Sequence, residues 1–199
     1  MNTDTERIDQ VGLAAEEMPS LAEFAEEPGG AWPKGWYSAE VIEGYATPKG
    51  TQFTTGDSLS KNGTSRNLTI CLRVDSGKGS SDGEGRAVGA GQTRNTFEQV
   101  NYRADDFTPD KMAMVAELRR ENKGVRGAWP GQADAQRTSL ALAKLGQIEK
   151  AMGATFKRTP QGLTAAHFVG RKVDVRFGVD EKGYNEVTAF APAGTRAKQ

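Results

Sequence analysis

Cationic and aromatic side chains recur in the polar stretches of this 199-residue sequence. Proteins that bind single-stranded nucleic acid without sequence preference combine cations that follow the phosphates with aromatic rings on which bases stack. The residues that could supply this chemistry are Phe53, Arg66, Arg73, Arg94, Phe97, Arg103, Lys172, Arg176 and Tyr184. Taken singly, each could be a solvated charge or a core aromatic, above all Arg66, Lys172 and Tyr184. Taken together, the nine residues favour a nucleic-acid-binding surface.

The sequence offers little that an enzyme or a cofactor site would need. A Gly-Lys-Gly-Ser stretch has neither the spacing nor the strand-to-helix context of a phosphate-binding loop. Cys71 is the only cysteine and His167 the only histidine, so no cluster has metal-ligand spacing. Asp105, Asp106 and Asp110 are close together, but they fall at a predicted helix start, where carboxylates stabilise the helix dipole. We therefore predict a protein that is not an enzyme and that holds no cofactor or metal.

Charge is distributed unevenly along the chain. Lysine and arginine together number 26, and so do aspartate and glutamate. Residues 1–28, however, carry eight acidic side chains and one arginine, a net charge of −7, which leaves +7 on the remaining residues. A basic body favours contact with nucleic acid.

Composition divides the chain into three parts. We interpret residues 1–30 as an acidic, flexible arm, which is either a mobile segment or a peptide that binds a partner through Leu21 and Phe24. Residues 31–193 are predicted to form the nucleic-acid-binding domain, and residues 194–199 a short basic tail. The acidic start lacks the basic region of a signal peptide, and no apolar run is long enough to predict a membrane span.

Apolar periodicity predicts five strands and two helices. The clearest strand has Leu68, Ile70, Leu72 and Val74 pointing inward between polar neighbours. The last two strands are joined by residues 180–183, which suit a type I turn closed by a left-handed glycine. The expected strands are 36–45, 66–75, 96–103, 172–179 and 184–190, and the expected helices are 108–124 and 134–152.

Two of these strands expose a polar face to solvent or to a ligand. On the third strand, Val100 and Tyr102 point inward, which places Phe97 on the opposite, polar face. The outward residues of the fourth strand are Lys172, Asp174 and Arg176.

The order of these elements predicts a mainly β fold with helices (α+β). Three strands, a helix and two strands give the order of a five-stranded Greek-key barrel of the oligonucleotide/oligosaccharide-binding (OB) type, with its helix between strands three and four. The helix at 108–124 is an extra element in that connection. Residues 47–65 are expected to be a long loop, and residues 76–91 a flexible glycine-rich hairpin loop. OB barrels bind ligands on strands two and three and on the loops after strands one and four, where the nine residues fall.

Three parts of the sequence resemble a family of bacteriophage proteins. They are Gly35-Trp-Tyr-Ser-Ala-Glu-Val, the helix ending in Met152-Gly153, and the closing segment from Gly170 to Pro192. The family was catalogued as a domain of unknown function and is regarded as single-stranded-DNA-binding proteins with an OB-like core, encoded in replication and recombination modules. The resemblance covers about residues 35–192.

The resemblance implies a partner and a location. It implies single-stranded DNA as the ligand and the cytoplasm of an infected bacterium as the location. Many phage and bacterial single-stranded-DNA-binding proteins carry an acidic, Phe-containing tail at the C-terminus, whereas this chain ends in a basic segment. The acidic N-terminal arm would then be the part that contacts phage or host replication and recombination proteins. Homo-oligomer formation is left open.

One alternative keeps the barrel but not the nucleic acid. The same small barrel could serve as a protein-interaction module or as a virion accessory protein. An oligonucleotide-binding assay separates these two functions.

Overall fold

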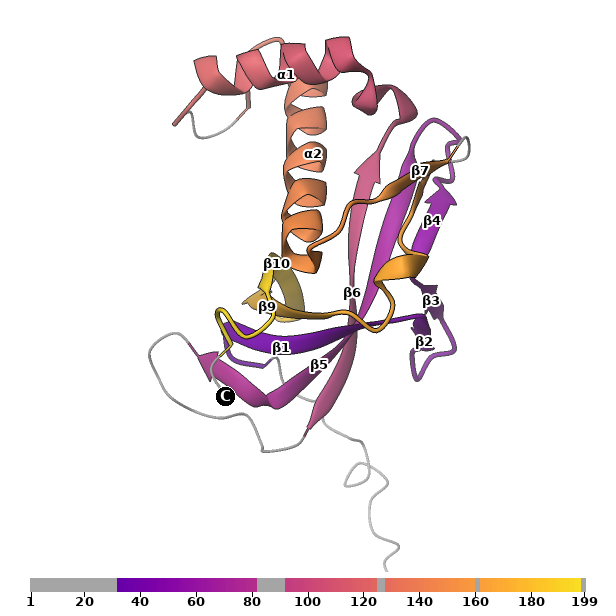
Figure 1. The fold of residues 1–199 in the computed structure, drawn as a ribbon, viewed down its shortest axis with the longest axis vertical. Helices are drawn as coiled ribbons and strands as arrows, with labels where there is room; N and C mark the ends of the chain where they lie inside the picture. The colour runs from indigo at the N-terminus through magenta and orange to yellow at the C-terminus, as the bar shows by residue number, and fades with distance from the viewer. Residues whose placement is uncertain (1–31, 82–91, 125–127, 160–161, 198–199) are drawn as a thin grey trace, which may run out of the picture. The chain divides into compact units, whose positions relative to one another are not determined.

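The computed structural model describes residues 32–81, 92–124, 128–159 and 162–197. Within these ranges it has a mixed α+β fold built mainly from antiparallel strands (Figure 1). The described residues belong to one unit, Ala31–Gln199. Predictions about the acidic arm at 1–30, and about residues 82–91 of the glycine-rich loop, lie outside the described residues.

Six of the nine candidate residues lie on strands of the main sheet. Its six strands are β1 (Gly35–Ile42), β4 (Gly56–Leu59), β5 (Arg66–Ser81), β6 (Thr93–Tyr102), β9 (Lys172–Val179) and β10 (Asn185–Pro192). Strands run in the order β10-β9-β1-β5, with all pairs antiparallel. One edge of β5 pairs with β1 and, farther along, with β4, while the other edge pairs with β6.

Alternation of apolar residues decides which face of the sheet is buried. Leu68, Ile70, Leu72 and Val74 of β5 are completely buried, as their spacing predicts. Tyr102 of β6 is 1% exposed and confirms the predicted register of that strand. The main core therefore lies on one face of the sheet, and the other face carries polar side chains together with Phe97.

Two helices follow β6. They are α1 (Pro109–Glu121) and α2 (Ala133–Met152), and two short 3-10 helices, η2 (Ala104–Phe107) and η3 (Ala166–Phe168), precede α1 and β9. Leu145 and Ile148 of α2 are buried in the core, and Gly153 ends the helix with a φ of 62°, a conformation that favours glycine. Figure 1 shows that α2 lies beside β6 and that α1 crosses the far end of α2, beyond the end of the sheet.

The predicted barrel is not closed. Among the described residues, β6 and β10 do not pair with each other, and each is an edge of the sheet. Lys144 of α2 instead joins the two edges, because its Nζ lies 3.1 Å from Glu98 on β6 and donates to the Val187 carbonyl of β10 at 3.2 Å. A helix side chain thus occupies the seam where strand pairing would close a barrel.

The polar segment at 47–65 is not the long loop expected from its sequence. It contains part of a hairpin, β2 (Gly44–Ala46) and β3 (Gln52–Thr54), and the sheet strand β4. Thr55 fastens this hairpin to the sheet, because its hydroxyl donates to the Ile42 carbonyl at 2.6 Å and accepts from the Cys71 amide at 2.9 Å. Strands of three or four polar residues are too short to show a clear alternation, which is why the pattern missed them.

The start of the predicted glycine-rich loop is also strand. The β5 backbone continues to Ser81, which is paired with Gly35 of β1. Pairing with a long neighbour holds this glycine-rich stretch extended, although its composition predicts a loop. A further hairpin, β7 (Lys157–Thr159) and β8 (Gly162–Thr164), covers one end of the sheet.

The alternation along β9 predicts that Asp174 faces solvent, but the structure buries it. Its carboxylate is completely buried and accepts hydrogen bonds from the backbone amides of Gly194, Arg196 and Ala197. Ala197 is itself buried. The start of the predicted basic tail is therefore fastened to β9 by a buried carboxylate.

Candidate nucleic-acid interface

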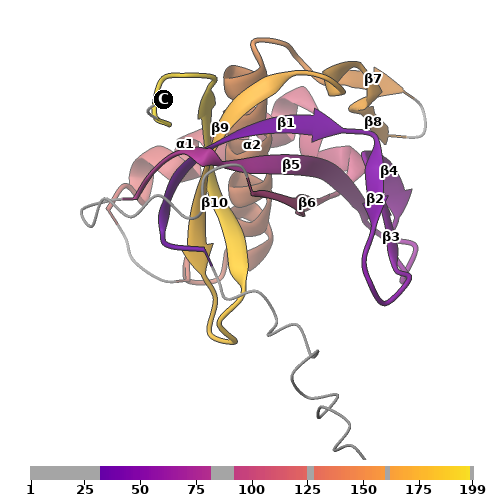
Figure 2. The same ribbon diagram turned by 90° about the horizontal axis from the view of Figure 1, so that it is seen from below.

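The face of the main sheet that points away from the core is called the outer face below. It consists of the odd-numbered residues of β5 and β6 and the even-numbered residues of β1 and β9, which the strand register places side by side. In Figure 2 these strands lie in front of the helices. Of the nine predicted residues, the register places Arg73, Phe97, Lys172 and Arg176 on the outer face, and Phe53 packs against it.

Aromatic rings stack at the end of the outer face that adjoins the β2–β3 hairpin. The ring of Phe53 lies 4.2 Å from the ring of Phe97, with 18° between their planes. Tyr45 stacks on Phe53 at 5.4 Å and 28°. All three side chains are half-buried, so each ring retains some exposed surface. Near-parallel stacking of this kind is also how a nucleobase packs on an aromatic side chain.

Tyr45 is the aromatic member that sequence reasoning missed. It is directly opposite Phe53 in the hairpin, and only the recognition of 44–54 as a hairpin would have placed the two rings together. Burial, and to a smaller extent the neighbouring Cys71, raises the pKa of Tyr45 to about 12. Burial also raises the pKa of the Cys71 thiol. The Tyr45 hydroxyl and the Cys71 thiol are therefore uncharged at neutral pH.

A groove next to the aromatic rings contains two of the predicted cations. Arg73 donates to Glu40 at 2.9 Å, and Lys172 is the register partner of Glu40 on β9. Both line a groove of about 420 Å³ together with Asp75 and Thr93. The Arg73 side chain is 51% exposed. An exposed ion pair contributes only about 0–1 kcal/mol, so a phosphate can replace Glu40 at little cost.

Amide side chains extend the outer face on the other side of the aromatic rings. Asn101 donates to Asn67 at 2.9 Å, and Gln99 donates to Thr69 at 3.3 Å. These neutral groups offer donors and acceptors without adding charge. They suit contacts to sugars, bases or phosphates at any sequence.

Arg94 and Tyr184 lie elsewhere. Arg94 is on the core side of β6, where its guanidinium stacks over the ring of Trp32 at 5.1 Å and donates to Asn185 at 2.7 Å. Burial lowers the pKa of Arg94. Tyr184 is in the β9–β10 turn and is 65% exposed. The predicted turn at 180–183 is confirmed, with Gly183 at a φ of 82° and its amide bonded to the Asp180 carbonyl.

Arg66 and Arg103 are also outside the outer face. Arg66 begins β5 and donates from Nε to Asp57, whose side chain is 7% exposed. Arg103 follows β6 and donates to Asp134 of α2 at 2.8 Å. The structure therefore gathers five of the nine residues on one surface and gives Arg94, Arg66 and Arg103 partners within the protein.

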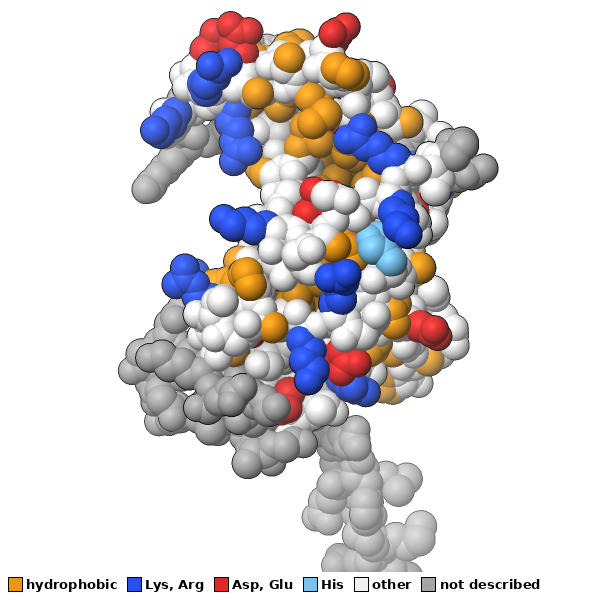
Figure 3. All heavy atoms as spheres, viewed as in Figure 1, with side chains coloured by type: hydrophobic (Ala, Val, Ile, Leu, Met, Phe, Trp, Pro, Cys, Tyr) orange, Lys and Arg blue, Asp and Glu red, His pale blue; other side chains and the backbone are white. Residues whose placement is uncertain are grey.

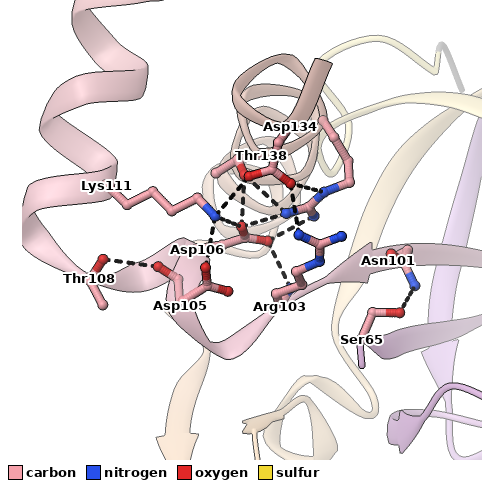
Figure 4. A network of polar contacts seen from close by, with 10 residues as sticks. Ser65, Asn101, Arg103, Asp105, Asp106, Thr108, Lys111, Asp134 and Thr138 are labelled. Carbon is pink, nitrogen blue, oxygen red and sulfur yellow. Dashed lines mark hydrogen bonds and ion pairs between the residues drawn. The ribbon is translucent and has the colours of Figure 1, made fainter. Parts of the chain in front are cut away.

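Of the acidic residues predicted at the helix start, Asp110 lies in the first turn of α1, whereas Asp105 and Asp106 join a polar network (Figure 4). Asp106 is completely buried and accepts two hydrogen bonds from Arg137, at 2.8 and 3.0 Å, and one from Thr138 at 2.7 Å. Burial alone would raise its pKa, but the bonds from Arg137, the Arg103 amide and Thr138 outweigh burial and hold the pKa of Asp106 at about 2. Lys111 of α1 also pairs with Asp105, Asp106 and Asp134, at 2.9, 3.3 and 3.2 Å. The network therefore joins η2, α1 and α2, which goes beyond the predicted effect on the helix dipole.

Two kinds of feature are absent from the described residues. Within the described ranges, no group of three or more His, Cys, Asp or Glu side chains is arranged to hold a metal ion. No helix in the same ranges combines the length and the apolar character that a membrane crossing requires.

Comparisons with known proteins do not test the predicted relationship to phage proteins. No protein-family model, no curated protein and no solved structure matches this chain.

Proposed function

We propose that this protein binds single-stranded DNA through the outer face of its sheet, without sequence preference. The observation that carries the proposal is the stack of Phe53 on Phe97 beside the groove that contains Arg73 and Lys172. Rings for bases and cations for phosphates are the two components that such binding needs. Phage replication or recombination is the setting that the sequence resemblance suggests.

The order of the strands supports the proposal at the level of the fold. Numbered along the chain as strands one to five, β1, β5, β6, β9 and β10 lie in the order three-two-one-four-five. This is the strand order of an OB barrel whose third and fifth strands are not joined, and we propose that the domain is an open variant of that fold. In OB proteins the second and third strands and the first long connection bind the ligand. These parts correspond to β5, β6 and the segment that carries Phe53.

The ion pairs of the outer face suggest how binding occurs. Arg73 holds Glu40 in an exposed pair, so the cation is already directed along the groove before any ligand arrives. A phosphate that displaces Glu40 keeps the guanidinium paired and releases counterions from the nucleic acid. The Tyr45, Phe53 and Phe97 rings then provide uncharged surface for bases that an intact duplex would not expose.

The test is binding of a labelled dT oligonucleotide and of a duplex of equal length over a series of salt concentrations. If about four phosphates are neutralised, the log–log slope of affinity against salt is about −3. We expect the duplex to bind much more weakly. A flat salt response, or equal binding of the duplex, would contradict the proposal.

A second candidate function, protein interaction, is favoured by an apolar groove on the helix side. The groove has a volume of about 250 Å³ and is lined by Phe107, Met112, Leu142 and other side chains from α1, α2 and the chain near β7. Met112 and Met114 are 38% and 45% exposed. Figure 3 shows hydrophobic side chains gathered where α1 and α2 meet, with lysine and arginine side chains around them. Absence of oligonucleotide binding together with capture of a protein partner would favour this candidate.

A further inference from the structure

A cavity of about 400 Å³ lies at the end of the sheet, away from the groove on the outer face. The start of β5, the end of β6, η2, the first turn of α1 and the β7–β8 hairpin supply its walls. Its charged lining residues are Arg66 and Arg158, and its aromatic lining residues are Tyr102 and Phe107. Within the described ranges, no aspartate or glutamate lines this cavity.

Arg158 is an exposed side chain that stacks on one aromatic ring. Its guanidinium lies over the ring of Phe107 at 4.9 Å, and its Nη1 is 3.5 Å from the Phe107 carbonyl. Among the ion pairs of the described residues, none includes Arg158. A guanidinium stacked on a ring keeps its edge free for a planar, bidentate partner.

Arg66 is held by an ion pair with Asp57. Asp57 accepts its Nε–H, and the Asp57 carboxylate is not among the groups that line the cavity. The hydroxyl of Tyr102 accepts from the Leu163 amide at 2.8 Å, and burial raises the pKa of Tyr102 to about 12, so the hydroxyl stays protonated. The Tyr102 hydroxyl in the cavity wall is therefore uncharged, and the Asp57 carboxylate remains paired with Arg66 close to it.

Gly162 permits this arrangement. A Cβ atom on Gly162 would collide with the Tyr102 hydroxyl, with Arg66 Nε and with the Asp57 carboxylate. Only glycine allows the β8 backbone to approach this closely, and its φ of 140° is one that other residues rarely adopt. The close approach brings the β7–β8 hairpin, and Arg158 with it, to the cavity.

We propose that this cavity binds a phosphate group, carried by a nucleotide or by the end of a nucleic-acid strand, between Arg66 and Arg158. Arginine recognises phosphate through paired, charge-assisted hydrogen bonds, and two guanidinium groups without a lining carboxylate suit a phosphomonoester. The first turn of α1 adds partial positive charge at the cavity wall. The site is distinct from the outer face and does not depend on the proposed binding of single strands there.

The test uses the full-length chain, calorimetric titration and three probes. The probes are inorganic phosphate, a deoxymononucleotide, and a dT oligonucleotide with or without a 5′ phosphate. We expect Arg158→Ala to weaken phosphate-dependent binding about tenfold, since it removes charge-assisted hydrogen bonds to the phosphate. Lys157→Ala is the matched control, because Lys157 is an exposed cation on the same strand that does not line the cavity.

Each outcome has a defined meaning. Binding of the free mononucleotide that Arg158→Ala weakens supports the site and assigns it to nucleotides. A preference for the 5′-phosphorylated oligonucleotide that Arg158→Ala abolishes supports the site and assigns it to strand ends. Absence of both responses, or equal effects of Arg158→Ala and Lys157→Ala, overturns the proposal.

Failure of the outer-face function would look different. Phe97→Ala alters only the outer face, so it should leave the response to phosphate and to the mononucleotide unchanged. If the unmodified chain binds the mononucleotide but no oligonucleotide, the outer-face function is rejected and the cavity site is kept.

Discussion

Two arginine–carboxylate pairs in this protein have the same chemistry and opposite consequences. Arg73 and Glu40 meet on the outer face, with side chains 51% and 34% exposed. Arg137 and Asp106 meet where η2, α1 and α2 join, and Asp106 is completely buried. Water screens the first pair, so it contributes little to stability and its cation remains available to a ligand. The second pair is removed from water, so breaking it would leave a buried charge without a partner. It therefore stabilises the fold and is not available to a ligand.

The largest effect is expected from a core residue that lies next to the proposed interface in sequence. Tyr102→Ala should lower the free energy of unfolding by about 3–5 kcal/mol, because a fully buried ring leaves a cavity. Urea denaturation measures this change. Affinity of the remaining folded protein for a dT oligonucleotide without a terminal phosphate should be unaltered, since the ring lies on the core side of β6 and not on the outer face. A variant as stable as the parent would show that the alternation along β6 is misassigned by one residue.

The next effect is a dependence of stability on pH. The pKa of Asp106 is about 2, below its ordinary value of 3.8. A lowered pKa gives stability that is present above pH 4 and is lost as pH falls towards 2, and a shift of this size corresponds to about 2 kcal/mol. Asp106→Asn should be less stable at pH 7 by a similar amount, and its stability should fall less between pH 4 and 2.

Glu40→Gln is the control for Asp106→Asn. Because Glu40 is in an exposed pair, its replacement should change stability by less than about 0.5 kcal/mol. Equal losses for the two variants would show that burial does not separate the two regions as we infer.

Phe97→Ala should act mainly on binding. Loss of its ring should weaken the affinity for a dT oligonucleotide by about 1–3 kcal/mol. Because Phe97 is half-buried against Phe53, we also expect a modest loss of stability, smaller than for Tyr102→Ala. Fluorescence anisotropy measures the affinity, and unaltered binding would exclude the aromatic stack from the interface.

Arg73→Ala should have a smaller effect that depends on salt. Removal of one phosphate contact should make the log–log salt slope less steep by about 0.7, with stability nearly unchanged. Arg119→Ala, an exposed arginine on α1, is the matched control and should leave the slope as it is. The same change in slope for both variants would indicate non-specific attraction to a basic surface.

The smallest effect concerns the acidic arm. Residues 1–28 and the rest of the chain have opposite net charges, so deletion of residues 1–28 should tighten DNA binding at low salt and leave thermal stability nearly unchanged. If the arm only recruits partners, affinity will stay the same and co-purification of a partner will be lost. Weaker DNA binding after the deletion would contradict both ideas.

The sequence by itself determined which faces of the long strands are buried. A strand with one buried face must alternate apolar and polar residues, so Leu68, Ile70, Leu72 and Val74 identified the core side of β5, and Tyr102 that of β6. The same rule placed Phe97 on the opposite face before any neighbour was known. The turn at Asp180–Gly183 was also predictable, because a left-handed position after three turn residues favours glycine.

Only the tertiary structure decided the partners of the charged residues. Arg73 and Arg94 are equally plausible cations in the sequence, but one is exposed beside Glu40 and the other is packed over Trp32. Asp174 follows a solvent-facing pattern and is nevertheless buried, with hydrogen bonds from backbone amides 20 to 23 residues away in the chain. The energy of a charge depends on burial and on groups distant in sequence, which no local pattern encodes. Backbone hydrogen bonds to a neighbouring strand likewise formed the β2–β3 hairpin and extended β5, where short or glycine-rich sequences predicted loops.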